Sequence, residues 1–122
     1  MAEAMVRGII EKGVSDPHDI VLGEPLPERR RFLAKEYDIQ VVADNLHVLD
    51  DASLIVLAIK PQIMDVVLPK LRNHLTESQT ILSIAAGVGI ERIRTAVEHD
   101  LLIRAMPNTP AQIGMGVTMW TS

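Results

Sequence analysis

Residues 54–61 read LIVLAIKP, and this stretch decides the fold class of the chain. Its first six residues are apolar and do not alternate with polar residues, which is typical of a strand covered on both faces. Lys60 ends the apolar run, and Pro61 suits the first turn of a helix because no N–H is needed there. The stretch therefore predicts a buried parallel strand that leads directly into a helix.

The same alternation of strand and helix extends in both directions from this stretch. Further strands are expected at residues 19–23, 39–43, 80–87, 101–106 and 116–122. Helices are expected at residues 1–12, 27–38, 61–71 and 90–99, with one or two helical turns at 45–51. Strands alternating with helices of about ten residues indicate βαβ units. The fold class is therefore α/β, with a doubly wound parallel sheet and helices on both faces.

The first helix has a clear end but no visible beginning. Lys12 and Gly13 are typical of a last turn followed by a glycine cap. Nothing in front of Met1 supplies an N-cap, so the pattern begins half-way through a βαβ unit. We therefore expect a sheet truncated at its N-terminus, with a strand and a tight turn missing before the helix.

Composition excludes several classes of protein. The chain has 122 residues, a net charge of -4 and no cysteine, so a nucleic-acid surface, disulfides and thiolate metal sites are not expected. The longest apolar run is far shorter than the roughly 20 residues that span a bilayer, and the start does not resemble a signal peptide. A cytoplasmic protein is expected. His18, His47, His74 and His99 lack metal-ligand spacing and are expected at the surface or at caps.

The carboxyl ends of the predicted strands carry small, polar or rigid residues rather than bulky apolar ones. They are Glu24, residues 44–45, residues 60–61, residues 85–87 and residues 106–108. In open parallel α/β sheets, ligands bind at this edge. Small residues there allow a flat or phosphorylated ligand to approach the backbone.

Three stretches together resemble a known family: residues 45–68, residues 81–93 and residues 102–118, the last of which contains MPNTP. They are similar to the N-terminal, Rossmann-like domain of pyrroline-5-carboxylate reductase, and the resemblance covers essentially the whole chain. It implies reduction of a cyclic imino acid to proline with NADP, with NAD as the alternative cofactor, in a homo-oligomeric enzyme. It also implies that residues 1–122 are a partial NAD(P)-binding domain, and that the helical dimerisation domain carrying most of the imine site is absent. We therefore assign no catalytic residue.

The resemblance also implies which residues contact the cofactor. Met1 and Ala2 match the end of the family's glycine-rich turn, at a helix N-terminus that receives the pyrophosphate. Asn45 is implied at the adenosine end, and the loop at residues 106–108 is implied beside the nicotinamide. The remaining implied contacts are Ala58, Ile59, Lys60 and Pro61 after one strand, and Ile84, Ala85 and Ala86 after the next.

Each of these assignments has a simpler alternative. Asn45 is also a good helix N-cap, Lys60 and Pro61 also form an ordinary strand end, and the Ala-Ala-Gly turn also serves close packing. Glu24 favours NAD, because an acidic residue there bonds the ribose hydroxyls, whereas Arg29 favours the 2′-phosphate of NADP. Arg29 lies in the first turn of a helix, where Glu28 or solvent could offset its charge. The sequence leaves the cofactor preference open.

Two other functions remain open. A related imine or hydroxyacid reductase of the same superfamily shares the fold, and a non-catalytic binding or assembly module fits the missing turn and domain. A receiver-type domain also uses a Lys-Pro strand end, but no acidic pocket is evident. Because a central strand is expected to be missing, we expect the isolated chain to be marginally stable, inactive and weak in NAD(P)H binding.

Overall fold

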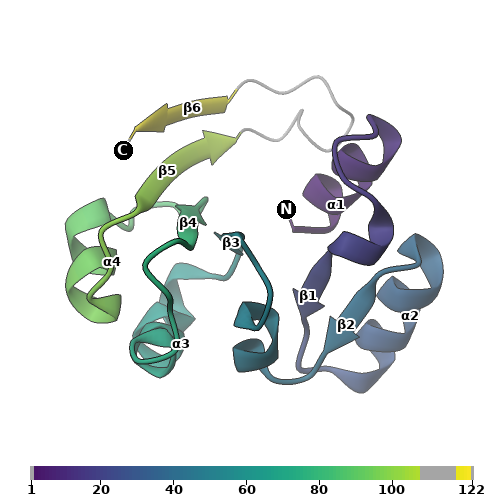
Figure 1. Ribbon diagram of the computed structural model, residues 1–122, viewed down its shortest axis with the longest axis horizontal. Helices are drawn as coiled ribbons and strands as arrows, with labels where there is room; N and C mark the ends of the chain where they lie inside the picture. The colour runs from purple at the N-terminus through teal and green to yellow at the C-terminus, as the bar shows by residue number, and fades with distance from the viewer. Residues whose placement is uncertain (1, 108–117, 122) are drawn as a thin grey trace. The chain divides into compact units, whose positions relative to one another are not determined.

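The computed structural model describes residues 2–107 and 118–121, which divide into two compact units. Unit 1 comprises residues 2–50 among those described, and unit 2 comprises residues 51–107 and 118–121. Each unit contains parallel strands and helices, as Figure 1 shows. The predicted α/β class is confirmed. No helix of the described residues is long and apolar enough to cross a membrane.

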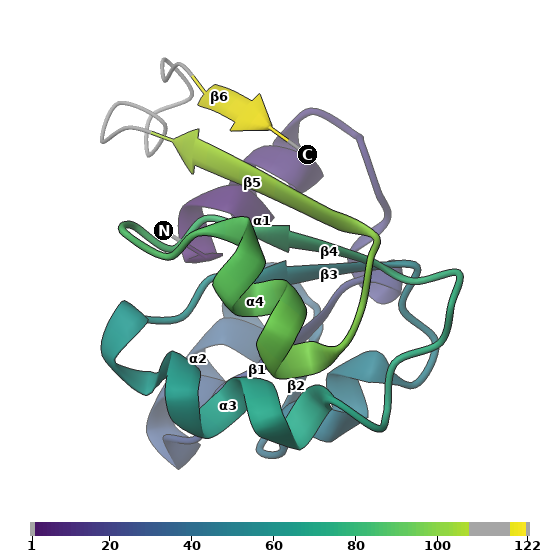
Figure 2. The same cartoon turned by 90° about the vertical axis from the view of Figure 1, so that its left-hand side faces the viewer.

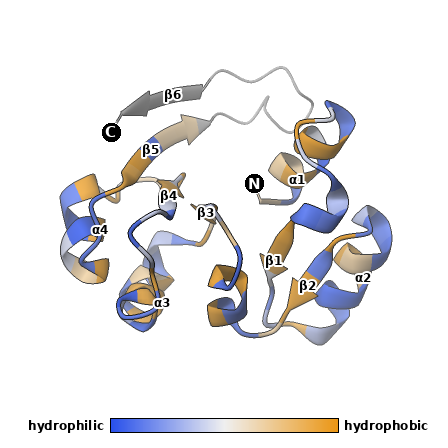
Figure 3. Ribbon diagram, viewed as in Figure 1, coloured by the Kyte–Doolittle hydropathy of each residue, from blue (hydrophilic) through white to orange (hydrophobic). Residues whose placement is uncertain are grey.

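Unit 1 contains two helices and a short parallel sheet. Its elements are α1 (Ala2–Glu11), η1 (Pro17–Asp19), β1 (Val21–Gly23), α2 (Pro27–Tyr37), β2 (Gln40–Val42) and η2 (Asn45–Leu49). Strand β1 pairs in parallel with β2 through the partners Val21 and Gln40. The helix α2 packs on β2 and is largely hydrophilic in Figure 3. Leu33 is its buried side chain, and Tyr37 is half-buried.

The ends of the unit 1 helices follow local rules. Gly13 adopts a φ of 64°, and the Val14 N–H donates to the Ile9 carbonyl, so the predicted glycine cap of α1 is confirmed. Helix α2 begins at Pro27 and ends before Asp38, which takes the left-handed conformation with a φ of 54°. An aspartate tolerates this conformation better than most residues. The turn into β2 is therefore tight.

Unit 2 contains a four-stranded sheet, and its helices connect the parallel strands along the chain. Its elements are β3 (Leu54–Leu57), η3 (Pro61–Ile63), α3 (Met64–Leu71), β4 (Thr80–Ser83), α4 (Ile90–Val97), β5 (Leu102–Pro107) and β6 (Thr118–Thr121). Strands β3, β4 and β5 are parallel in that order, and β6 adds an antiparallel edge to β5. The sheet is therefore mixed.

The helices of unit 2 cover one face of their sheet. Successive right-handed connections between neighbouring parallel strands put α3 and α4 on the same side, and Figure 2 shows both helices in front of the sheet. Ile55 and Leu57 on β3 are buried, but Leu54 is 51 % exposed. Val56, on the same face of β3 as Leu54, is half-buried, so the covering of this second face stays a prediction.

Candidate functional site

The carboxyl ends of β1 and β2 meet at one edge of unit 1. The backbone N–H of Glu24 donates to the Val42 carbonyl at 2.9 Å, which extends the pairing of the two strands by one residue. Asn45 opens η2 directly after β2. The structure thus places two predicted site residues, Glu24 and Asn45, at neighbouring strand ends.

Gly23 and Asn45 lie against each other at this edge. A Cβ atom at Gly23 would collide with the amide oxygen of Asn45, so the glycine makes room for that side chain. Asn45 is not the N-cap of η2; Asp44 is, because its carboxylate accepts a hydrogen bond from Leu46 N at 2.9 Å. The capping alternative for Asn45 is therefore wrong, and its exposed amide is left for another role.

The turn between β1 and α2 is held by its own side chains. The Glu24 carboxylate accepts a hydrogen bond from Leu26 N at 3.0 Å. The Arg30 guanidinium donates to the carbonyls of Glu24 and Pro25 at 3.0 and 2.7 Å. The N-cap residue Leu26 makes no side-chain capping bond, and the bonds of Glu24 and Arg30 hold the turn in front of the helix. Arg30 therefore fixes the backbone of this turn.

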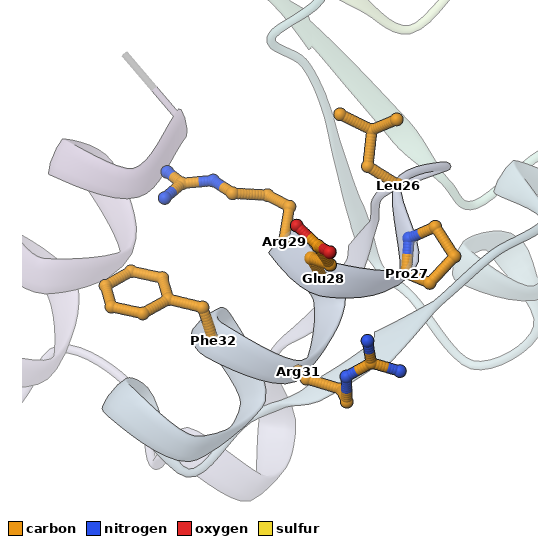
Figure 4. Close-up of a pocket in the computed structure, with 6 residues that line it drawn as sticks. All are labelled: Leu26, Pro27, Glu28, Arg29, Arg31 and Phe32. Carbon is orange, nitrogen blue, oxygen red and sulfur yellow. The ribbon is translucent and has the colours of Figure 1, made fainter.

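Arg29 is paired with a residue far from it in the sequence. Its guanidinium donates to the carboxylate of Glu3 on α1 and lies over the Phe32 ring at 5.2 Å from the centroid. The partner of Arg29 is therefore Glu3, and not Glu28 or solvent alone as the sequence suggested. Figure 4 shows Arg29 and Phe32 extending toward one side of α2 and Arg31 toward the other. These residues border an open hollow at the start of α2, lined by Leu26, Pro27, Glu28, Arg29, Arg31 and Phe32.

Glu3 is the centre of a polar cluster that joins α1 to α2. The Tyr37 hydroxyl donates to Glu3 at 2.6 Å, and Arg7 donates to the same hydroxyl at 3.1 Å. The hydrogen bond from Tyr37, followed by the one from Arg29, lowers the pKa of Glu3 below its ordinary value, although partial burial opposes the shift. Glu3 is therefore ionised at neutral pH.

Unit 2 carries its own edge of predicted site residues. Because β3 and β4 are parallel, the segments that follow these two strands lie at one edge of the sheet. Residues 58–61 follow β3 and residues 84–86 follow β4. Lys60 is exposed, and the side chains of Ala85 and Ala86 leave little bulk there. The predicted strand at 80–87 is too long: β4 ends at Ser83, and Gly87, with a φ of 71°, forms the turn.

The strand predicted at residues 101–106 continues to Pro107, into the segment that was expected to be a loop. Met106 pairs with Met119 and Pro107 with Thr118 in the antiparallel sheet, so these two residues belong to β5. The pairing of β5 with β4 ends at Arg104, which leaves no parallel ladder bond for the proline to interrupt. Asn108 and Met1 lie outside the described residues, and Ala2 is the first residue of α1.

Two buried polar residues were not expected from the sequence. His99 is only 9 % exposed, and its Nε2 lies 2.5 Å from the Gln79 carbonyl. The Gln79 side chain donates to the Ala52 carbonyl and accepts from Thr76 N, both at 2.9 Å. The prediction of a surface or capping role is therefore wrong for His99. The signal missed was its position directly after a helix, where it reaches the start of a neighbouring strand.

These observations define what the two edges can do. Each presents backbone and small or polar side chains at the carboxyl ends of parallel strands, where a nucleotide can lie along them. Among the described residues, neither edge supplies a nucleophile with an adjacent base.

Comparisons with known proteins agree with this arrangement. The chain is 39 % identical over 97 % of its length to pyrroline-5-carboxylate reductase of Synechocystis, and it covers 44 % of that protein. The solved pyrroline-5-carboxylate reductase of Coxiella burnetii superposes with a TM-score of 0.91 at 29 % identity, over 98 % of this chain and 44 % of that one. The Plasmodium falciparum enzyme, solved with NADP bound, has a TM-score of 0.82 at 23 % identity over 98 % of this chain and 43 % of that one, a likeness of fold.

The chain thus spans less than half the length of these relatives. The predicted resemblance and the Rossmann-like fold are confirmed by them. A family model described as NADP oxidoreductase, coenzyme F420-dependent, matches residues 1–87. Since residues 1–87 are more than half of the chain, the chain belongs to this family of dinucleotide-binding oxidoreductases.

Proposed function

We propose that residues 1–122 form part of the nicotinamide-dinucleotide-binding domain of a pyrroline-5-carboxylate reductase. The complete enzyme reduces the C=N bond of 1-pyrroline-5-carboxylate with a hydride from the cofactor and yields proline. The observation that carries the proposal is the gathering of candidate residues at carboxyl strand edges, Glu24 with Asn45 in unit 1 and residues 58–61 with 84–86 in unit 2. The similarity to the named reductases supplies the reaction.

The cofactor is NADP(H), with NAD(H) as the alternative. An NADP-bound relative of the same fold supports the first, and Glu24 at the end of β1 supports the second. Ala2 at the start of α1 would face the pyrophosphate, where backbone N–H groups and the helix dipole favour an anion. The cofactor supplies the hydride, and the protein orients the cofactor and pairs the charges of its phosphates.

The domain is partial in this proposal. Among the described strands, β1 pairs only with β2, and β3 pairs on one side only, with β4. Each open edge can accept a further parallel strand from sequence outside residues 1–122. A helical domain for dimerisation and imine binding, homo-oligomeric assembly and a cytoplasmic location belong to the same proposal.

Mapping of cofactor binding tests the proposal. The isotope-labelled chain is titrated with NADPH and NADH while backbone amide NMR signals are followed. We expect weak binding and shifts concentrated in residues 58–60 and 84–86, together with the amides of Glu24 and Asn45. An excess of ATP is the control for binding of any nucleotide. Shifts spread over α3 and α4, or none at all, would favour the non-catalytic module instead.

A further inference from the structure

Arg29 is the residue that the sequence indicates for binding a 2′-phosphate, but in the structure it is already paired with a carboxylate. Its guanidinium is paired with the Glu3 carboxylate, and both side chains are partly shielded, Glu3 with 27 % and Arg29 with 41 % of the side chain exposed. The Phe32 ring lies under the guanidinium and helps to fix its plane. An anionic ligand that uses Arg29 must therefore compete with Glu3.

Glu3 is itself held in place for this pairing. Tyr37 donates to its second carboxylate oxygen at 2.6 Å, and Arg7 lies 3.6 Å from that same oxygen. The carboxylate thus has one oxygen directed to Arg29 and the other to Tyr37. A side chain already restrained at one oxygen by Tyr37 loses less freedom when it pairs with Arg29, which makes it an effective competitor.

The neighbouring arginines do not substitute for Arg29. Arg30 donates to two main-chain carbonyls, those of Glu24 and Pro25, and holds the turn. Arg31 extends to the other side of α2 in Figure 4. Arg29 is thus the arginine of this helix turn that lies beside α1, whose N-terminus is the proposed pyrophosphate site.

We infer that Glu3 determines cofactor specificity by competing with the 2′-phosphate of NADPH for the Arg29 guanidinium. The inference rests on the proposed function. Carboxylate and phosphate both suit the planar fork of an arginine, and one guanidinium cannot satisfy both fully. NADPH must displace Glu3, and the displaced carboxylate then repels the phosphate. NADH carries a hydroxyl at the same position and leaves the pair intact.

The test is the ratio of the dissociation constants of NADPH and NADH, measured by fluorescence titration of the 122-residue chain at low salt. Glu3→Gln keeps an acceptor for Tyr37 and removes the charge. We expect it to improve NADPH binding relative to NADH by at least about threefold, an effect that shrinks with added salt. Glu11→Gln removes the same charge from the exposed end of α1 and is expected to leave the ratio unchanged.

A double-mutant cycle separates competition from a general structural effect. In an Arg29→Gln background, Glu3→Gln is expected to lose most of its effect on the ratio of the two dissociation constants, because the guanidinium for which Glu3 and the phosphate compete has been removed. A merely structural role for Glu3 would change both dissociation constants equally and leave the ratio constant. That result would overturn the inference while the proposed function stands. If no variant binds either dinucleotide, the proposed function fails and the inference falls with it.

Discussion

Unit 1 and unit 2 are stabilised by different kinds of contact. Unit 2 has a continuous apolar core, in which Met64, Leu68 and Ile81 have no exposed surface. In the described part of unit 1, the buried apolar side chains are Val6, Leu33, Ile39 and Leu49. Its two helices are joined instead by the polar cluster around Glu3. Two strands with so small a core are marginal by themselves, so the polar cluster matters more in unit 1 than a similar one would in unit 2.

Deleting core volume in unit 2 gives the largest expected effect. Leu68→Ala removes a fully buried side chain from α3 and should lower the free energy of unfolding by about 2–5 kcal/mol, because the site cannot collapse completely. Urea denaturation followed by circular dichroism measures it. Val66→Ala on the same helix, where the side chain is 59 % exposed, should change little. Equal losses for both variants would contradict the description of unit 2 as the unit with the apolar core.

Removing the buried polar link of unit 2 should cost less. Gln79→Ala deprives the Ala52 carbonyl and Thr76 N–H of a partner in a buried place, which predicts a loss of about 1–3 kcal/mol. The exposed neighbour serves as the control, and Glu77→Ala should be close to neutral. If thermal denaturation finds the two variants alike, the buried hydrogen bonds of Gln79 contribute nothing.

A smaller effect is expected at the edge of unit 1, on binding rather than on folding. Gly23→Ala displaces the Asn45 amide, and we predict dinucleotide binding weakened by about three- to tenfold with little change in stability. Gly8→Ala, in α1 with open space around it, should leave binding unchanged and slightly strengthen the helix. Calorimetric titration with both variants checks this. Unchanged affinity in Gly23→Ala would remove Asn45 from the proposed site.

The smallest predicted effect is a dependence of stability on pH that is confined to unit 1. Since the pKa of Glu3 is lower in the folded chain than its ordinary value of 4.5, the unfolded chain binds the proton more readily. The stabilisation by Glu3 is therefore complete above that ordinary value and is lost as the pH falls through the lowered pKa. In the unsubstituted chain, the amides of α1 should become less protected against hydrogen exchange as the pH is lowered.

The matched variants sharpen this prediction. In Glu3→Gln, the protection of the α1 amides against exchange should no longer fall on acidification, whereas in Glu11→Gln it should still fall. An identical dependence in Glu3→Gln would mean that the polar cluster does not hold α1 to α2.

Features set by neighbouring residues were predictable from the sequence. Pro27 marks the start of α2, and Gly13 marks the end of α1, because each acts through its own backbone. The apolar run at residues 54–57 likewise identified β3. The edges of candidate residues followed from the rule for parallel strands once these elements were placed.

Features set by distant residues were not predictable in the same way. The pairing of Arg29 with Glu3 joins positions 26 residues apart, and Glu28 was the local expectation. His99 and Gln79 are 20 residues apart, with no spacing pattern to connect them. Pro107 looked like part of a loop because the antiparallel pairing of β5 with the strand predicted at residues 116–122 is known only from the fold.

The polar link at the start of the unit 2 strands has a consequence for how this unit can diversify. Gln79 joins the segments that enter β3 and β4, and His99 joins the segment that enters β5 to Gln79, so the amino-terminal side of the sheet is fastened by hydrogen bonds. At the opposite side, the segments that follow β3 and β4 are joined through the main chain, where Ile84 N–H donates to the Leu57 carbonyl at 3.2 Å. Residues 58–61 and 84–87 can therefore be redesigned for new ligands while the fastened side preserves the scaffold.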